Sequence, residues 1–438
     1  MKQYEIYKDS GIEWLGEIPE HWKFSKLKYH TSKIIDGAHF TPTYIDDKKG
    51  VPFLRVTDIH KSEIDLEKVK RIPVDEHKEL IKRCFPKKGD LLLSKNGTIG
   101  LMKIVNWDWD FSIFVSLCLI KFEKTLLNSF FYYFFKSNVV ERQIFESSQK
   151  TSVTNLHLEK IKELRITIPP LEEQTQIANY LNHKTARLDN LIAKKEQIIK
   201  LLEEERKAVI NQAITKGIDP NVPMKDSGIK WLGEIPKHWK VLKMKYVSRV
   251  SRGAILRPVD EPSYFDENGE WTYLNISDAT KCDKYLSEGK LRLSELGSNK
   301  SARIKPGNLV ITASATIGKP FINTIPICIH DGFIPLNDLK VNIDYMYYYF
   351  KNPQLFVGIG KSNTQKNIYV SEVKMMDVPV PSSKEQIEIP LYIEKENNRI
   401  DAIVSKIQKE INLLKEYKIA LISEVVTGKV DVRQEILN

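Results

Sequence analysis

Two long stretches of apolar residues at seven-residue spacing constrain this chain more than any other feature. The first runs from about Glu172 to Ile214, begins after Pro169-Pro170 and stops at Gly217. Proline before a segment, acids in its first turn and glycine after it are typical of an α-helix. At ~1.5 Å per residue, this helix would be about 60 Å long. A helix with so long an apolar stripe needs a partner helix of equal length.

The chain supplies such a partner 212 residues later, as Gln386 against Gln174 illustrates. The second helix is predicted from Ser382 to about Val426 and opens with a capping box, Ser382 with Glu385. Two unrelated amphipathic helices are the alternative, but amphipathicity alone does not produce identities at a fixed offset. Lys195, Arg206 and Lys418 interrupt the stripes. The residues predicted to form the seam of the helix pair are Leu181, Leu188, Ile192, Ile199, Leu202, Val209, Ile393, Ile400, Val404, Ile407, Ile411, Leu414 and Leu421.

A second repeat marks the start of each half of the chain. Lys8 to Tyr29 reads KDSGIEWLGEIPEHWKFSKLKY and Lys225 to Tyr246 reads KDSGIKWLGEIPKHWKVLKMKY, with 17 of 22 positions identical. Because the whole peptide is kept, its tryptophans are predicted to fix it to the protein by burying their rings. Stacking on bases is the alternative role. These tryptophans are Trp14, Trp22, Trp231 and Trp239.

Two weakly related regions, 24–168 and 241–380, lie between the repeated parts. Gly89–Gly100 (GDLLLSKNGTIG) answers Gly307–Gly318 (GNLVITASATIG). Short β-branched runs predict strands and aromatic blocks predict buried helices, so each region is expected to be a mixed α/β domain. A duplicated frame with two diverged domains suits a protein that recognises two different things. The predicted strands include Arg165–Ile168 and Val378–Val380, and the predicted helices include Phe130–Phe135 and Tyr345–Phe350.

The order of these pieces resembles the specificity subunit of a type I restriction-modification system over essentially the whole chain. The resemblance is carried by the WLGEIPxHW peptides, the two glycine-bounded segments and the sequence IPPLEEQTQIANYL at Ile168–Leu181. In the second copy this last sequence has become VPSSKEQIEIPLYI at Val380–Ile393. There, serines replace Pro170 and Leu171, which leaves the symmetry of the two helix ends open.

The resemblance implies an α/β (α+β) fold. In it, two mixed α/β target-recognition domains are joined by two long antiparallel coiled-coil helices in an internal pseudo-two-fold repeat. The corresponding boundaries are 1–168 for the first marker and domain, 169–217 for the central helix, 218–380 for the second marker and domain, and 381–438 for the distal helix and tail. The resemblance also implies binding of split double-stranded DNA and assembly with two modification (methyltransferase) subunits and with restriction/translocase subunits. S-adenosylmethionine, ATP and Mg are expected on those partners and not on this chain.

The residues themselves carry no motif for chemistry. We find no G-x-x-x-x-G-K-[ST], no glycine-rich dinucleotide loop and no H-E-x-x-H. The four cysteines form no C-x-x-C pair, which favours a reducing cytoplasm, and neither a signal peptide nor a membrane-spanning run is evident. A net charge of +10 favours a polyanionic partner, nucleic acid before membrane. An enzyme in its own right and a coiled-coil scaffold that binds only protein are the competing hypotheses.

Candidate DNA contacts are loop residues that mix base, amide and hydroxyl groups near glycine, because such groups hydrogen-bond phosphates and base edges. A solvated turn is the alternative for each residue taken alone. Lysine at 95 against alanine at 313 indicates that the matched loops recognise different sequences, so we expect a bipartite target with unlike halves. The candidates in the first half are His39, Lys48, Lys49, Arg55, Ser94, Lys95, Asn96, Thr98, Gln149, Lys150, Thr151 and Thr154. Those in the second half are Arg252, Arg257, Asn275, Lys300, Arg303, Ser314, Thr316, Asn363, Thr364, Gln365 and Lys366.

Overall fold

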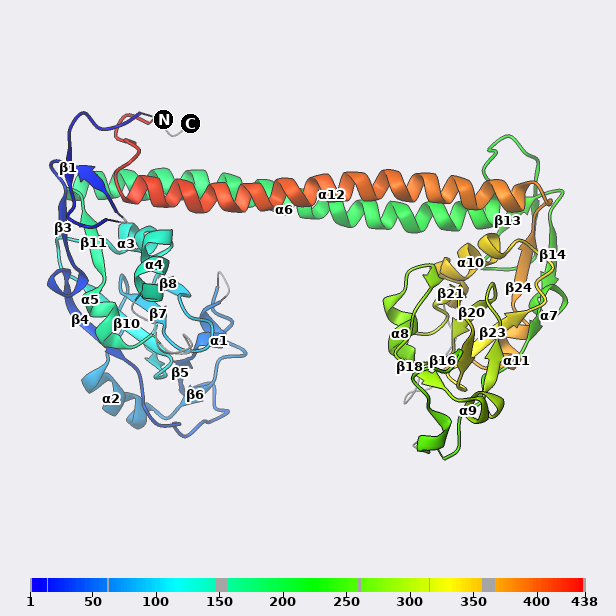
Figure 1. Ribbon diagram of the computed structural model, residues 1–438. Helices are drawn as coiled ribbons and strands as arrows, with labels where there is room; N and C mark the ends of the chain where they lie inside the picture. The colour runs from blue at the N-terminus through cyan, green and yellow to red at the C-terminus, as the bar shows by residue number, and fades with distance from the viewer. Residues whose placement is uncertain are drawn as a thin grey trace. The chain divides into compact units, whose positions relative to one another are not determined.

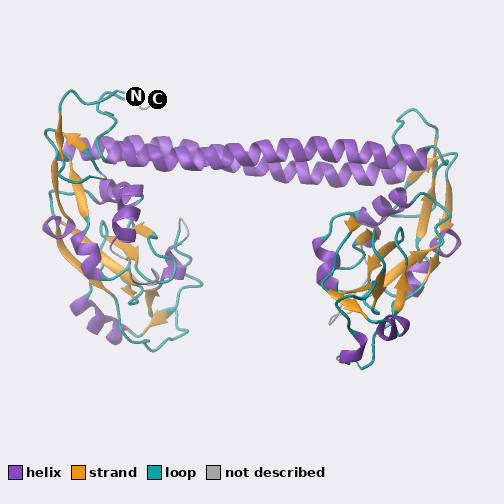
Figure 2. Cartoon of the chain, in the orientation of Figure 1, coloured by secondary structure: helices purple, strands orange, loops and turns teal. Residues whose placement is uncertain are grey.

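The computed structural model describes two compact units. The described residues are 2–13, 15–60, 63–146, 156–258, 261–314, 316–356 and 367–435. The first unit comprises residues 1–195 with 408–438, and the second comprises residues 196–407. Each unit contains one mixed domain of strands and short helices together with the adjoining parts of both long helices (Figures 1 and 2).

The two long helices form where the sequence predicts them. α6 (Leu171–Lys216) has 46 residues and α12 (Glu385–Val426) has 42. The predicted start of α12 at Ser382 is three residues too early, because Ser382 is a cap and not part of the helix. Its backbone N–H and its hydroxyl both donate to the Glu385 carboxylate, at 3.0 and 2.7 Å.

The helices run antiparallel within each unit. In the first unit Lys418 bonds Asp189 at 2.6 Å and Lys195 bonds Glu410 at 2.6 Å, so residue numbers rise on one helix as they fall on the other. Both lysines interrupt the predicted stripes, and each finds its acid on the opposite helix. In the second unit, Arg206 is paired in the same way. None of the predicted seam residues is exposed, as expected for side chains between two helices.

The first domain is built around an antiparallel sheet of order β4-β10-β7-β8, beside a small sheet of order β6-β5-β9. In Figure 1, α3 and α4 lie between the first sheet and the helix pair. The elements are β1 (Tyr7–Asp9), β2 (Glu17–Pro19), β3 (Lys23–Lys26), the 3-10 helix η1 (Leu27–His30), β4 (Thr31–Asp36), β5 (Val51–Leu54), α1 (Val56–Ile59), β6 (Arg71–Ile72), α2 (Val74–Arg83), β7 (Leu91–Ser94), β8 (Met102–Ile104), β9 (Ser112–Ile113), β10 (Leu117–Phe122), α3 (Asn128–Phe135), α4 (Asn138–Glu146), α5 (Leu158–Glu163) and β11 (Arg165–Ile168).

The second domain repeats this plan with a five-stranded sheet, β15-β23-β20-β21-β17, and a four-stranded sheet, β18-β16-β22-β19. Its elements are β12 (Met224–Asp226), β13 (Glu234–Pro236), β14 (Lys240–Lys243), α7 (Met244–Val247), β15 (Arg249–Val250), η2 (Pro262–Tyr264), β16 (Trp271–Leu274), α8 (Ile276–Lys281), β17 (Tyr285–Leu286), β18 (Leu291–Leu293), α9 (Glu295–Asn299), β19 (Ala302–Ile304), β20 (Leu309–Thr312), β21 (Pro320–Asn323), β22 (Ile327–Ile329), β23 (Phe333–Asn337), α10 (Ile343–Lys351), η3 (Pro353–Phe356), α11 (Val370–Lys374) and β24 (Asp377–Val380).

The repeated parts of the sequence attach each domain to the helix pair. The marker strand β3 pairs with β11, the strand that leads into α6, and β14 pairs with β24 before α12. The aromatic blocks form α3 and α10, which are buried as predicted. A glutamine in the first turns of each long helix accepts a hydrogen bond at 2.8 Å from the backbone N–H at the start of the aromatic helix. Gln174 bonds Leu127 and Gln386 bonds Asn342.

The marker tryptophans are mostly buried, in agreement with their predicted structural role. Trp22 and Trp239 are completely covered, and Trp231 is half-buried against Tyr349. Trp14 lies outside the described residues. Base stacking is therefore excluded for Trp22 and Trp239 in this structure.

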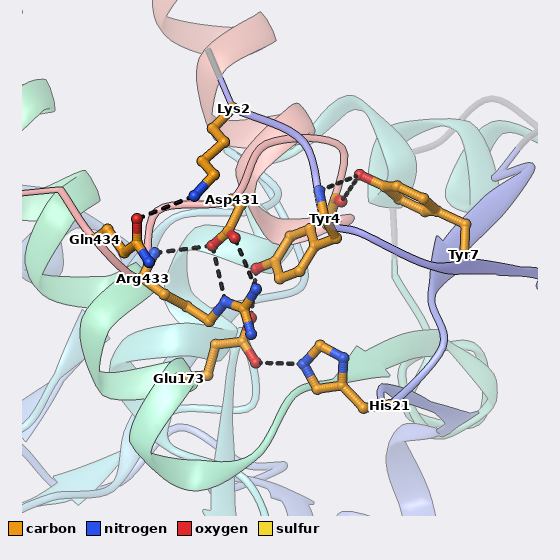
Figure 3. A network of polar contacts seen from close by, with 9 residues as sticks. Lys2, Tyr4, Tyr7, His21, Glu173, Asp431, Arg433 and Gln434 are labelled. Carbon is orange, nitrogen blue, oxygen red and sulfur yellow. Dashed lines mark hydrogen bonds and ion pairs between the residues drawn. The ribbon is translucent and has the colours of Figure 1, made fainter.

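Both ends of the described chain belong to the first unit. The backbone N–H of Asp431 donates to Lys2 O at 2.9 Å, and the Lys2 ammonium donates to Gln434 at 3.0 Å (Figure 3). The Arg433 guanidinium lies 4.8 Å from the centre of the Tyr4 ring. The tail after α12 thus packs against the N-terminal segment.

Candidate nucleic-acid interface

The loop after β7 is a tight turn held by its first side chain. Ser94 is buried, accepts a hydrogen bond from Leu101 N at 2.8 Å and donates to Thr98 O. The second domain repeats the turn with Thr312, which donates to Thr316 O and accepts from Lys319 N at 3.1 Å. Ser94 therefore shapes its loop and does not face solvent.

The outer part of each loop carries the accessible polar groups. Thr98 and Thr316 are exposed, while Asn96 and Ser314 are half-buried. The Asn96 side-chain oxygen is itself buried and has no hydrogen-bond partner among the described residues. An amide and hydroxyls in this setting can hydrogen-bond base edges or phosphates.

Lys95 is held inside the first domain by a buried acid. Its ammonium lies 2.9 Å from Asp36 at the end of β4, and the two side chains are 8% and 5% exposed. The same carboxylate bonds His39 at 2.9 Å and Arg83 at 2.6 Å. Burial alone would raise the pKa of Asp36, but hydrogen bonds from His39, Lys95 and Arg83 lower this pKa to about 2. In this conformation Lys95 is not accessible to a duplex.

Asp36 and Arg83 were missed by sequence reasoning, although the internal repeat holds a signal for Asp36. Asp36-Gly37 answers Arg252-Gly253, and the backbone bonds repeat with them. Gly37 N donates to Leu117 O at 3.2 Å, and Gly253 N donates to Phe333 O at 3.1 Å. A Cβ on Gly37 would lie 1.9 Å from Ile113 O, so only glycine fits there.

The second predicted polar loop of each domain falls outside the described residues. This applies to Gln149, Lys150, Thr151, Thr154, Asn363, Thr364, Gln365 and Lys366. The described chain resumes beside the first loop in both domains. Leu156 N donates to Lys95 O at 2.7 Å, and Ile368 N donates to Ala313 O at 2.9 Å.

The other first-domain candidates lie at the surface with acidic neighbours. Lys48 is exposed and lies 3.1 Å from Glu67, and Lys49 is exposed beside it. Arg55 is half-buried and bonds Asp58 at 3.2 Å. The Lys48–Glu67 pair is exposed and contributes little stability, so Lys48 can exchange its acid for a phosphate. Asp58 is only 8% exposed, so the Arg55 pair is more deeply embedded in the protein.

The second-domain candidates gather partly around aromatic rings. Lys300 donates to the Tyr264 hydroxyl at 2.9 Å, and the Arg303 guanidinium lies 5.2 Å from the centre of the Trp271 ring. Arg257 joins them, because its carbonyl accepts from the same Tyr264 hydroxyl at 3.1 Å.

Two further candidates of the second domain lie elsewhere on its surface. Arg252 is exposed and lies 3.4 Å from Asp331. Asn275 is exposed at the N-cap of α8.

The described residues show no sign of a metal centre or a membrane segment. No group of histidine, cysteine and acidic side chains among them could hold a metal ion. None of the described helices is both long enough and apolar enough to cross a bilayer.

Comparison with known proteins yields relatives that match along the whole chain. The putative type I restriction enzyme MjaX specificity subunit of Methanocaldococcus jannaschii is 26% identical and covers 98% of this chain, which spans 99% of that protein. The type I restriction enzyme EcoKI specificity subunit of Escherichia coli strain K12 is 22% identical, over 91% of this chain and 86% of that one.

Solved structures share the fold. A chain from work on complex assembly and conformational transition of the type I R-M system superposes with a TM-score of 0.71, at 16% identity, over 94% of this chain and 99% of that chain. The HsdS subunit from Thermoanaerobacter tengcongensis gives a TM-score of 0.56, also at 16% identity, over 94% and 98%.

A family model identifies both halves of the molecule. The type I restriction modification DNA specificity domain matches residues 19–204 and again residues 236–413, which is most of the chain. With the repeated fold and the full-length relatives, this double match shows that the chain belongs to the family of type I restriction-modification specificity subunits.

Proposed function

We propose that this chain recognises a bipartite DNA target with two unlike halves, one read by each domain. The observation that carries the proposal is the chemical difference at structurally matched positions. Asp36 and Lys95 in the first domain correspond to Arg252 and Ala313 in the second, on an otherwise repeated backbone. Asp36 and Lys95 are buried, so the difference acts on the bases through the exposed groups that these positions hold in place, and differently placed groups select different bases.

The candidate residues fall into two groups, according to whether they would contact base edges or phosphates. Asn96, Thr98, Ser314 and Thr316 are the candidates for base edges, because neutral amides and hydroxyls discriminate between donors and acceptors. The basic residues at the surface are the candidates for phosphates, which set affinity and orientation without selecting sequence. These are His39, Lys48, Lys49, Arg55, Arg83, Arg252, Arg257, Lys300 and Arg303.

The outer faces of the long helices are the proposed docking sites for two modification subunits, with restriction/translocase subunits joining the assembly. Exposed apolar side chains on these faces support the proposal, because such side chains are better covered than hydrated. They include Leu191, Leu413 and Tyr417 in the first unit and Ile198, Leu201 and Leu391 in the second. We assign S-adenosylmethionine, ATP and Mg to the partner subunits.

Mapping methylated adenines genome-wide, with and without this gene, tests the target. The expected result is one gene-dependent motif made of two different halves separated by unspecified bases. A palindromic motif or one continuous block would contradict the proposal. Binding of random duplex DNA across a salt series separates a DNA reader from a protein-only scaffold, since affinity for DNA falls steeply with salt.

The helix pair is the proposed ruler between the halves. Four residues inserted in both helices, after Glu203 and after Ile403, should lengthen the pair by ~6 Å and nearly restore the seam. We expect the same half-sites with a spacer longer by about one to two base pairs, at ~3.4 Å per pair. The matched control inserts two residues at each site, which rotates the seam by ~200° and should abolish assembly. An unchanged spacer in the four-residue variant would rule out the ruler.

A further inference from the structure

Asp36 is a buried acid of the first domain that three basic side chains surround. Its two carboxylate oxygens are both used: Oδ1 bonds His39 Nε2 at 2.9 Å and Arg83 Nη2 at 2.6 Å, and Oδ2 lies 2.9 Å from Lys95 Nζ. A buried carboxylate is stable only when donors satisfy it in this way. The arrangement joins one acid to three basic side chains, so the cluster as a whole stays positive.

The three partners of Asp36 come from separate parts of the chain. His39 lies in the loop after β4, Arg83 ends α2, and Lys95 lies in the loop after β7. The guanidinium of Arg83 also donates to Gly37 O at 2.9 Å, which ties α2 to the end of β4. The carbonyl of Lys95 holds Leu156 N. One side chain therefore fixes the relative positions of every described loop that carries first-domain candidates near β7.

Exposure separates the partners into two groups. Lys95 is 8% exposed and acts as an internal support. His39 is 60% exposed and Arg83 is 49% exposed, so their outer faces remain free to meet a phosphate or a base. Asp36 itself is covered and touches no ligand in any pose that keeps this packing.

The second domain has different residues at the positions that match Asp36 and Lys95. Arg252 replaces the acid and bonds Asp331, and Ala313 replaces the lysine. Both members of the Arg252 pair are about half exposed, so this pair can rearrange without leaving a buried charge. The buried carboxylate with three basic partners is thus a property of the first domain.

We propose that Asp36 is a positioning residue for DNA specificity: by placing His39, Arg83 and the loop after β7, it determines which bases the first domain accepts. The inference rests on the proposed function and adds a residue that acts through others. It predicts that a change at Asp36 alters the half-site of the first domain and leaves the half-site of the second domain intact.

The test maps methylation in cells whose gene carries Asp36→Asn or Asp36→Asn with Lys95→Met. The single change leaves the Lys95 charge buried alone, whereas the double change removes both charges and relieves that cost. In the double variant we expect discrimination at one or more bases of the first half-site to fall at least tenfold, with the second half and the spacer unchanged. Thermal unfolding of the purified complex checks that the variant is folded.

The matched control is Asp75→Asn, on α2 in the same domain, where the carboxylate is 98% exposed. It should leave the motif unchanged. If the double variant methylates the parental motif at parental occupancy, Asp36 serves only stability and the inference is wrong. If Asp36→Asn alone loses all methylation, the motif methylated by the double variant shows whether the loss comes from unfolding or from altered base recognition.

The failure of the proposed function would look different. In that case the parental gene itself would produce no bipartite motif. A parental bipartite motif that survives in both Asp36 variants would overturn only the positioning role.

Discussion

The repeated marker peptide, Lys8–Tyr29 and Lys225–Tyr246, contacts the start of a long helix in each half of the chain. We call each of these contacts a joint, and the two joints differ in their hydrogen-bond partners. Each joint centres on a glutamate in the first turns of the helix, Glu173 in α6 and Glu385 in α12. A carboxylate there faces the unpaired N–H groups and the positive end of the helix dipole. In both joints the histidine of the marker lies 2.9 Å from this carboxylate, His21 in the first and His238 in the second.

In the first joint, the other hydrogen-bond donor to the glutamate comes from the N-terminal segment. The Tyr4 hydroxyl donates to Glu173 (Figure 3). The Tyr4 ring packs edge-on against Trp22. Burial and the neighbouring carboxylate hold the pKa of Tyr4 well above its ordinary value, so the hydroxyl remains a donor. Arg433 from the tail covers the ring. The indole N–H of Trp22 has no hydrogen-bond partner among the described residues.

In the described residues, the second joint is formed by the marker and the helix cap. Trp239 Nε1 donates to Glu385 at 3.0 Å, and Ser382 donates to the same carboxylate. Burial would raise the pKa of Glu385, but hydrogen bonds from Ser382, Trp239 and His238 hold it below its usual range. The difference shows that one repeated marker peptide fits two helix starts, and that the first start depends on residues far away in the sequence.

Removing the tail should break the first joint and spare the second. Ending the chain after Lys429 removes Val430 and Val432, which are buried, together with Arg433. Each valine contributes ~1.5–3 kcal/mol by burial, so the first unit should lose several kcal/mol. Segment-resolved hydrogen exchange should accelerate around Tyr4 and the start of α6 and stay unchanged around Trp239. Equal acceleration in both joints would show that the tail supports the whole molecule.

Alanine at each central glutamate should give unequal losses. Glu173→Ala leaves the buried Tyr4 hydroxyl without an acceptor, and we expect a loss of ~2–4 kcal/mol in the first unit. Glu385→Ala should cost ~1–2 kcal/mol, because water reaches this less buried site and can replace the carboxylate. Urea unfolding followed by hydrogen exchange in each unit measures both. A larger loss for Glu385→Ala would reverse the comparison.

Acid should weaken the first domain through Asp36, a carboxylate that the second domain replaces with Arg252. The folded pKa of about 2 lies below the ordinary value of 3.8. A depressed carboxylate contributes stability above its unfolded pKa and loses it as pH falls through the folded value. This contribution, about 2 kcal/mol, should vanish between pH 3.8 and about 2. Pepsin pulse proteolysis of the parental chain and Asp36→Asn measures it; identical pH dependence would contradict the assignment.

Phenylalanine in place of each buried marker tryptophan should give the smallest difference. Trp239→Phe removes the bond to Glu385, whereas Trp22→Phe removes an N–H that bonds no atom in the described part of the chain. After the shared loss of ring size, Trp239→Phe should cost about 1 kcal/mol more. Thermal unfolding of the two variants, read by segment, gives the comparison. Equal costs would mean that the Trp239 bond contributes no net stability.

Sequence reasoning succeeded where the signal is local or repeated. The seven-residue period located α6 and α12, and it placed Ile411 and its neighbours between them. The interruptions at Lys195 and Lys418 did not disturb the pattern, because each lysine meets an acid on the opposite helix. The aromatic blocks were also predicted correctly as α3 and α10. Their signal is local too, because blocks of large aromatic residues are expected to be buried.

The candidate site was only partly predictable from the sequence. The loop after β7 was found because its glycines and hydroxyls repeat, but Lys95 was indistinguishable from an exposed lysine. Its partner Asp36 and their shared neighbour Arg83 are 47 residues apart, with no periodicity to connect them. The repeat at Gly37 and Gly253 was a usable signal for the position of Asp36 that sequence reasoning did not use, and it carries no information on the ion pairs.

The sequence by itself determined the duplicated frame, the helix pair and the family of this protein, because period, repetition and motif order are written along the chain. Only the tertiary structure decided which polar groups are buried and which face outward. Glu173 and Tyr4 are 169 residues apart, and they meet because the marker, the tail and α6 pack together. Desolvation and hydrogen-bond geometry are properties of that packing, so they set the roles of Asp36, Lys95 and the two joints only after the chain has folded.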